Sequence, residues 1–173
     1  MTSQTMSFLA PPKPWLCQGD IFASVPILEF IESNVYGPAM LVTFGCVIDK
    51  RNNAGKSRVS HLSFLPVRSV ASLQPDQQRL IRMSPSELRP YAALYLGQLG
   101  GLGESYVNLV EPFSLPASMF SVRMHDFSMM LPEERDPMRL VSQANGDRLH
   151  ALTDDHLDLF LNKWRAHWTG VTS

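Results

Sequence analysis

The stretch AMLVTFGCVI, residues 39–48, is the most continuously apolar part of this sequence and decides the fold class. It is far shorter than the roughly 18–20 apolar residues that a membrane-spanning helix needs. A short apolar run bounded by turn residues is typical of a strand that is buried on both faces of a sheet. We therefore predict a buried strand over residues 39–48.

Flanking segments predict more short strands. Residues 21–25 indicate a strand that Pro26 must end or place at a sheet edge, because proline lacks an N–H donor. A polar turn over residues 49–57 leads to a return strand over 59–70, which Pro66 breaks or bends. Later segments are predicted as a helix over Asp76–Met83 and strands at 91–96, 106–110 and near 119–124.

The C-terminal residues predict an amphipathic helix. Thr153 is a good N-cap, two aspartates follow in the first turn, and Gly170 suits the stop. The apolar stripe consists of Leu157, Phe160, Leu161, Trp164 and Trp168. A lone helix of this length is not stable unless that stripe is buried, so we expect it to form core or a partner contact, with Trp164 and Trp168 as the partner-binding residues.

Together these elements predict a mainly β (α+β) protein. We expect a small β-barrel with a short middle helix and a C-terminal amphipathic helix. The predicted divisions are an extended N-terminal arm (1–18), a barrel-like β domain (19–131), and a polar loop with the C-terminal helix packed on the domain (132–173).

Composition excludes several classes of protein. The 173 residues suit one domain, and two cysteines are too few for a disulfide scaffold. The first residues lack the features of an export signal, so we expect a cytoplasmic protein that does not engage a membrane. No zinc, P-loop or G-x-S-x-G pattern occurs, and we expect no metal and no cofactor.

The formal net charge of −1 hides a basic block. Residues 50–89 contain eight basic and two acidic side chains, and both flanking regions are acidic. Four cations, Lys50, Arg51, Lys56 and Arg58, surround the predicted turn. Such a segment binds phosphates in a salt-dependent way, so these four are the candidate nucleic-acid-binding residues. The alternative to a binding site is an exposed turn whose lysine and arginine side chains serve only to keep it solvated.

Three short segments carry a resemblance to a known family. They are GDIF at 19–22, GPAMLV at 37–42 and LSFLPVRS at 62–69. Their order resembles the PemK/MazF toxin-like family of small SH3-like barrels over roughly residues 18–72. The resemblance implies a metal-independent, sequence-selective endoribonuclease that is often dimeric and paired with an antitoxin, in keeping with a phage or mobile-element origin.

This sequence departs from the family pattern at two positions. Gly37 stands where the family has an arginine, and Arg68 stands where a threonine is usual, with Ser69 one residue later. In such an RNase an arginine stabilises the developing phosphorane charge and a base activates the ribose 2′-hydroxyl. The candidate catalytic residues are Arg58, His61, Arg68 and Ser69.

Two hypotheses without catalysis stand beside the RNA-cleaving one. A barrel that lacks the family arginine and threonine is also suited to be an adaptor that binds RNA or a protein. An inhibitor or assembly protein would instead use the apolar C-terminal helix as its partner surface. The expected partners are therefore RNA, a protein such as an antitoxin or a host protein, or a second copy in a homodimer.

Overall fold

A computed structural model describes residues 7–13, 16–27, 35–48, 59–83, 85–90, 92–120, 122–124, 140–142 and 148–170. Its strands are β1 (Leu9–Ala10), β2 (Asp20–Ile27), β3 (Val35–Leu41), β4 (His61–Ser69), β5 (Ala93–Leu99), β6 (Gly103–Asn108), β7 (Phe113–Pro116), β8 (Val122–Met124), β9 (Leu140–Ser142) and β10 (Arg148–Leu152). Its helices are α1 (Gly45–Ile48), α2 (Pro75–Met83) and α3 (Asp154–Thr169), with 3₁₀ turns η1 (Val70–Ser72) and η2 (Ala117–Met119).

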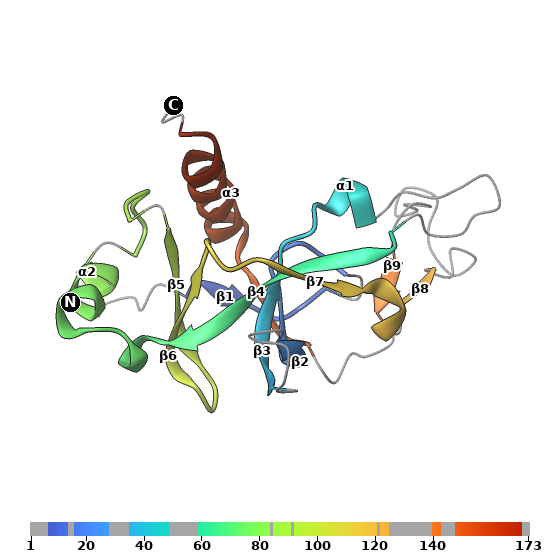
Figure 1. The fold of residues 1–173 in the computed structure, drawn as a ribbon, viewed down its shortest axis with the longest axis horizontal. Helices are drawn as coiled ribbons and strands as arrows, with labels where there is room; N and C mark the ends of the chain where they lie inside the picture. The colour runs from blue at the N-terminus through green and yellow to red at the C-terminus, as the bar shows by residue number, and fades with distance from the viewer. Residues whose placement is uncertain are drawn as a thin grey trace.

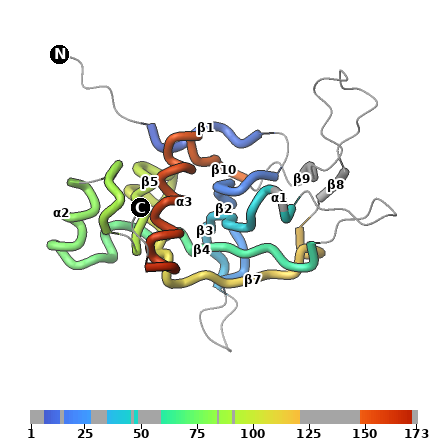
Figure 2. Tube along the Cα trace, turned by 90° about the horizontal axis from the view of Figure 1, so that it is seen from above, coloured from blue at the N-terminus to red at the C-terminus, as the bar shows by residue number. Residues whose placement is uncertain are grey.

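The protein is mainly β, as the sequence predicts. Eight strands form one antiparallel sheet in the order β1-β10-β2-β3-β4-β6-β5, with β7 also paired to β4, and the sheet curls into a nearly closed barrel (Figures 1 and 2). The short strands β8 and β9 form a separate pair. Helix α3 contacts β10 and β5, and it stands beside the end of the barrel where β1 and β5 lie (Figure 1).

Strand β3 explains why its sequence is continuously apolar. Successive side chains of a strand point to opposite faces. Ala39 and Leu41 pack in one core cluster, which includes Phe22, Phe64 and Leu115. Met40 packs in the other, which includes Leu94, Val107 and Phe160. Both faces are therefore buried, as we predicted for this strand.

The predicted length of that strand is wrong at its carboxyl end. β3 ends at Leu41, and Gly45–Ile48 forms the single helical turn α1. Thr43 marks the change, because its Oγ1 accepts a hydrogen bond from the backbone N–H of Ser63 at 2.7 Å. Ile48 is fully buried in the cluster that contains Leu41. An apolar run alone does not distinguish a strand from a short buried helix.

Two prolines within strands, Pro26 and Pro66, lie where the pairing of the strand changes. Pro26 pairs with Tyr36 of β3, whereas β10 pairs with β2 only at residues 20–22. Pro26 therefore lies at a local edge, which is one of the two predicted outcomes. Pro66 lies in β4 between the residues that pair with β7 (61–64) and those that pair with β6 (67–69). β4 is thus continuous, and Pro66 marks the change of neighbour.

The predicted helices are confirmed. α2 covers Pro75–Met83, and α3 follows Thr153 and ends at Gly170, whose φ of 65° is the left-handed geometry that glycine favours. The predicted buried stripe of α3 is only partly right. The buried residues are His156, Phe160, Lys163 and Ala166, whereas Leu157, Leu161 and Trp164 are half-buried.

A buried ion pair joins the two ends of the chain. The Nη1 of Arg148 on β10 donates to the Oδ2 of Asp20 on β2 at 2.8 Å, and both side chains are at most 1% exposed. The backbone N–H of Cys17 donates to the same oxygen at 2.8 Å. Burial raises the pKa of Asp20 although Arg148 and this N–H act to lower it. Desolvation therefore offsets much of the attraction within the pair.

Replacing one member of this pair is predicted to be more harmful than replacing both. Asp20→Leu or Arg148→Met leaves one buried charge without its counter-ion, and each is expected to lower the free energy of unfolding by about 3–5 kcal/mol. The double variant Asp20→Leu/Arg148→Met is expected to be more stable than either single variant. Urea denaturation followed by circular dichroism measures all four proteins. Additive losses in the double variant would contradict the prediction.

Candidate nucleic-acid interface

Three of the four candidate catalytic residues lie on β4. His61 is its first residue, is exposed, and has its Nδ1 3.2 Å from the Oγ of Ser60. Its register partner on β7 is Pro116. The imidazole is therefore at the end of β4 that follows the basic segment in sequence, where solvent can reach it.

Arg68 and Ser69 lie at the other end of β4, and both side chains already make hydrogen bonds within the protein. The Nε and Nη2 of Arg68 donate to the Oε2 of Glu111 at 3.0 and 2.7 Å. Asn108 Nδ2 donates to the other carboxylate oxygen of Glu111 at 3.1 Å. The Oγ of Ser69 accepts from the backbone N–H of Ala71 at 3.2 Å and so caps η1. The guanidinium charge is balanced, and the hydroxyl oxygen already accepts a hydrogen bond.

The structure does not bring His61 together with Arg68. They are seven positions apart along an extended strand, which corresponds to about 23 Å. Arg68 and Ser69 are neighbours, and neighbouring residues of a strand point to opposite faces. Arg58, Lys50, Arg51 and Lys56 lie outside the described residues. Among the described residues, no acid–base pair is assembled beside an arginine on β4.

The two candidate partner-binding tryptophans differ in exposure. Trp164 is half-buried, and its ring centroid lies 5.6 Å from that of the buried Phe160. Trp168 is 54% exposed, and its ring lies 5.8 Å from that of Trp164. Trp164 therefore contributes to the core that α3 covers, and Trp168 presents an aromatic ring to solvent near the end of the helix.

Two buried polar side chains of α3, Lys163 and His156, were not predicted from the sequence. Lys163 is 2% exposed, and its Nζ donates to the carbonyls of Leu88 and Pro90 at 3.0 and 2.8 Å. Burial lowers its pKa to about 8. His156 is also buried, with Nε2 2.6 Å from the carbonyl oxygen of Tyr95, and burial lowers its pKa. Helical spacing from Phe160, at i−4 and i+3, is the signal that places both residues on the buried face.

A surface cluster joins α2 to the β5–β6 hairpin. Arg82 Nη2 lies 2.6 Å from Glu104 Oε2, and the hydroxyl of Tyr95 donates to Glu104 Oε1 at 2.8 Å. The hydrogen bond from Arg82 lowers the pKa of Glu104. Burial, followed by the bond to Glu104, raises the pKa of Tyr95 to about 12. This pairing balances Arg82, one of the eight cations in the basic block.

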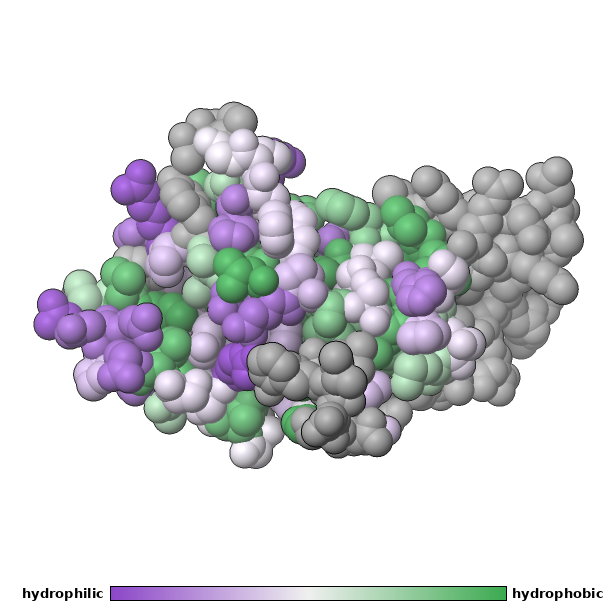
Figure 3. Space-filling view, in the orientation of Figure 1, coloured by the Kyte–Doolittle hydropathy of each residue, from purple (hydrophilic) through white to green (hydrophobic). Residues whose placement is uncertain are grey.

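The hydrophilic side chains of this face gather in two places. Figure 3 shows one group over α2 and another near the centre of the face, below α3, with polar and apolar residues mixed around them. Within the described ranges, no group of three or more histidine, cysteine, aspartate or glutamate side chains is placed to hold a metal ion. No helix in the described part of the chain is long and apolar enough to cross a membrane.

The lysine in the core predicts a pH-dependent stability. Because the pKa of Lys163 is about 8 in the folded protein against 10.5 normally, the unfolded chain binds more protons between these values. The contribution of Lys163 to the free energy of unfolding is therefore expected to rise with pH over that window, by on the order of 3 kcal/mol.

The variant Lys163→Met isolates this effect. The free energy of unfolding of the parent protein minus that of the variant is expected to increase from pH 7.5 to pH 10. Urea denaturation measures both values. The range stops short of the pKa of about 12 for Tyr95, so that phenol stays protonated. If this signed difference stayed constant or decreased as the pH rises, Lys163 would not become neutral in the folded protein over this range.

Comparison with known proteins adds no family to these observations. No protein-family model matches the chain, and none of the curated proteins matches it either.

Proposed function

We propose that this protein is a PemK/MazF-like barrel protein that binds RNA through its basic segment, without a metal ion. The observation that carries the proposal is the placement of the three resembling segments. They fall on β2, β3 and β4, which are consecutive neighbours in one antiparallel sheet. The basic segment lies in sequence between Ile48, at the end of α1, and β4, which begins at the exposed His61.

Electrostatics support binding through this segment rather than through the rest of the basic block. Arg68 is paired with Glu111, and Arg82 is paired with Glu104. Lys50, Arg51, Lys56 and Arg58 remain as the dense group of cations in the sequence. Phosphate contacts from lysine and arginine supply affinity that does not depend on base sequence and that falls as salt rises. His61, three residues after Arg58 in sequence, adds a polar, exposed ring for contact with a base or ribose.

The contacts of β4 favour binding over cleavage. Metal-independent cleavage needs a base at the 2′-hydroxyl and a cation at the developing phosphorane charge within one site. His61 and Arg68 are at opposite ends of β4, and the charge of Arg68 is already paired with Glu111. RNA binding therefore needs no rearrangement of the described residues, whereas cleavage by His61 together with Arg68 does.

Charge reversal in the basic segment is predicted to abolish most RNA binding. The variant Lys50→Glu/Arg51→Glu/Lys56→Glu/Arg58→Glu is expected to weaken binding of a labelled single-stranded RNA by at least about a hundredfold at low salt. The slope of log K against log salt is expected to fall by about 0.7 for each lost phosphate contact. Fluorescence anisotropy across a salt series measures both quantities.

A matched pair of single variants controls for net charge. Arg51→Glu is expected to weaken binding, whereas Arg79→Glu, at an exposed position of α2, is expected to change it little. Equal effects of the two variants, or no saturable binding by the parent protein, would contradict the proposal.

Cleavage is tested by incubating the same RNA with the parent protein in the presence of EDTA, which removes metal ions. Products that disappear in His61→Ala would extend the proposal to a metal-independent endoribonuclease.

A second candidate function, engagement of a protein partner by α3, is favoured by Trp168. An exposed tryptophan that rests on a second tryptophan offers a large, rigid apolar contact, and tryptophan is enriched at the energetic centre of interfaces. The partner that can be tested directly is a second copy of the chain, since symmetric dimers are the commonest assembly of soluble proteins.

Trp168→Ala is therefore predicted to shift a homodimer toward monomer without loss of fold. Sedimentation velocity over a concentration series measures the dissociation constant, which is expected to rise at least about tenfold. Met83→Ala, at a position that is 69% exposed on α2, is the control and is expected to leave dimerisation unchanged. A parent protein that stays monomeric throughout the series would exclude the homodimer.

A further inference from the structure

The residues on the two sides of the basic segment meet at one point of the sheet. The backbone N–H of Val42, just after β3, donates to the carbonyl of Ser63 on β4 at 2.8 Å. The backbone N–H of Ser63 in turn donates to the Oγ1 of Thr43 at 2.7 Å. Phe44 directly follows Thr43, and His61 lies two positions before Ser63. Phe44 and His61 therefore lie close to the place where the chain leaves the sheet and returns to it.

Phe44 presents an aromatic ring to solvent at this place. Its carbonyl accepts hydrogen bonds from the N–H groups of Val47 and Ile48 at 2.9 and 3.1 Å, which hold its backbone at the start of α1. The side chain is nevertheless 49% exposed, although phenylalanine is a residue type that folding usually buries. Exposed aromatic side chains are the groups on which proteins stack the bases of single-stranded nucleic acids.

The adjoining face of β4 and β7 carries hydroxyl and imidazole groups. Every second residue of a strand points to the same face, and directly paired residues of neighbouring strands share a face. Ser63 pairs with Ser114, and His61 lies two positions before Ser63, so these three side chains share one face. The Oγ atoms of the two serines are 3.0 Å apart. One hydroxyl donates to the other, so the second keeps its own proton for a further acceptor.

The neighbouring charges indicate what kind of ligand would reach this surface. Lys50 lies two residues after the end of α1, and Arg58 lies three residues before His61. Cations thus begin shortly after Phe44 and end shortly before His61, and they favour a polyanion. A single-stranded nucleic acid combines phosphates for such cations with bases that have an apolar face and a polar edge. The ring of Phe44 matches the face of a base, and the serine hydroxyls match its edge.

We propose that Phe44 and the Ser63–Ser114 hydroxyl pair form a base-binding subsite for single-stranded RNA. The ring of Phe44 stacks on a nucleobase, and the serine hydroxyls hydrogen-bond to the edge of a base or to a ribose 2′-hydroxyl. The phosphates of the same strand meet the cations of the basic segment. Because every base has a face that can stack, the subsite adds affinity with little dependence on base sequence.

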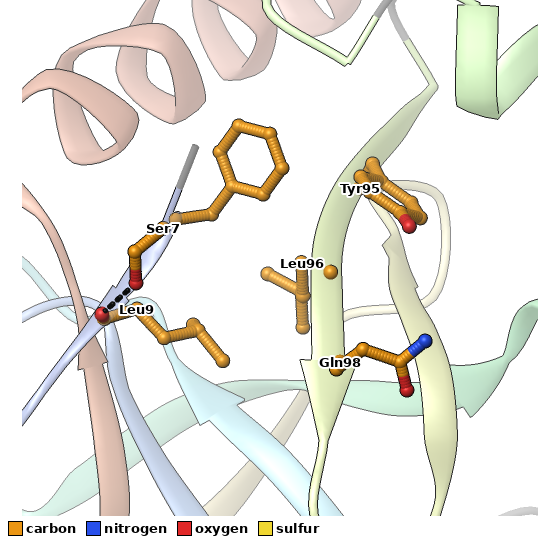
Figure 4. A pocket seen from close by; sticks show the side chains of 7 residues that line it. Ser7, Leu9, Tyr95, Leu96 and Gln98 are labelled. Carbon is orange, nitrogen blue, oxygen red and sulfur yellow. Dashed lines mark hydrogen bonds between the residues drawn. The ribbon is translucent and has the colours of Figure 1, made fainter. Parts of the chain in front are cut away.

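This inference rests on the RNA binding proposed above and adds a contribution that the cations alone cannot make. Cations bind phosphates whether or not bases are attached, whereas stacking requires a base. The two contributions can therefore be measured separately. The pocket of about 520 Å³ between Leu9 of β1 and Leu96 of β5 is not involved, since its lining contains neither Phe44 nor the two serines (Figure 4).

The probes are two labelled strands of equal length and charge, an oligouridylate and a ribose-phosphate strand that lacks the bases. Fluorescence anisotropy at low salt is expected to show that the full chain binds oligouridylate at least about fivefold more tightly than the base-free strand. Phe44→Leu keeps an apolar side chain and loses the aromatic ring. It is expected to remove this difference by weakening only the binding of oligouridylate, whereas Phe44→Trp is expected to preserve it.

Further variants separate stacking from charge and from general effects on the fold. In Phe44→Leu the slope of log K against log salt is expected to stay unchanged, because stacking releases no counter-ions. Ser63→Ala/Ser114→Ala is expected to weaken binding of oligouridylate several-fold and to leave the base-free strand unchanged. Tyr36→Leu, at a position of β3 that is 63% exposed, is the matched aromatic control and is expected to change neither. Circular dichroism confirms that each variant is folded.

The outcomes distinguish this subsite from the proposed function. Equal binding of the two probes by the parent protein, or an equal loss for both probes in Phe44→Leu, would overturn the subsite and leave binding through the basic segment standing. A loss of oligouridylate binding in Tyr36→Leu as large as that in Phe44→Leu would also overturn the subsite. No saturable binding of either probe would overturn both proposals.

Discussion

The buried ion pair between Asp20 and Arg148 is the contact on which the arrangement of the chain ends depends. It joins β2 to β10, strands whose paired residues are separated by 128 positions in sequence. β10 lies between β1 and β2 in the sheet, and α3 begins two residues after it. The pair therefore fixes the position of the strand that carries α3 onto the barrel and supports the N-terminal arm.

The energetic role of this pair is one of specificity as much as stability. Burial raises the pKa of Asp20, which means that the fold disfavours the charged carboxylate even beside a guanidinium. A buried charge is tolerated only where its partner is present, so a register slip of β10 would leave both groups uncompensated. Lys163 acts in a similar way on α3, because its buried Nζ donates to the carbonyls of Leu88 and Pro90.

β4 determines how the proposed functions are distributed. It changes its neighbour from β7 to β6 at Pro66, so its two ends belong to different parts of the barrel (Figure 1). The end that begins at His61 follows the basic segment, and the end at Arg68 is occupied by the contact with Glu111. Trp168 lies on α3 instead. RNA and a protein partner would thus engage different elements of one small barrel.

Local patterns in the sequence determined the fold class, because burial on two faces, proline placement and helix caps are written into neighbouring residues. They predicted a buried strand over residues 39–48, of which residues 39–41 are strand, and both ends of α3. They also gave the edge position as one of two outcomes for Pro26. The same patterns could not distinguish a strand from the helical turn at Gly45–Ile48, since a short apolar run suits either. Only the tertiary structure decided that Arg68 meets Glu111, that His61 lies far from Arg68, and that Asp20 meets Arg148. It also decided that a pocket lies between Leu9 of β1 and Leu96 of β5 (Figure 4). Each of these depends on strand pairing between residues distant in sequence, and such pairing is set by packing of the whole chain rather than by any local segment.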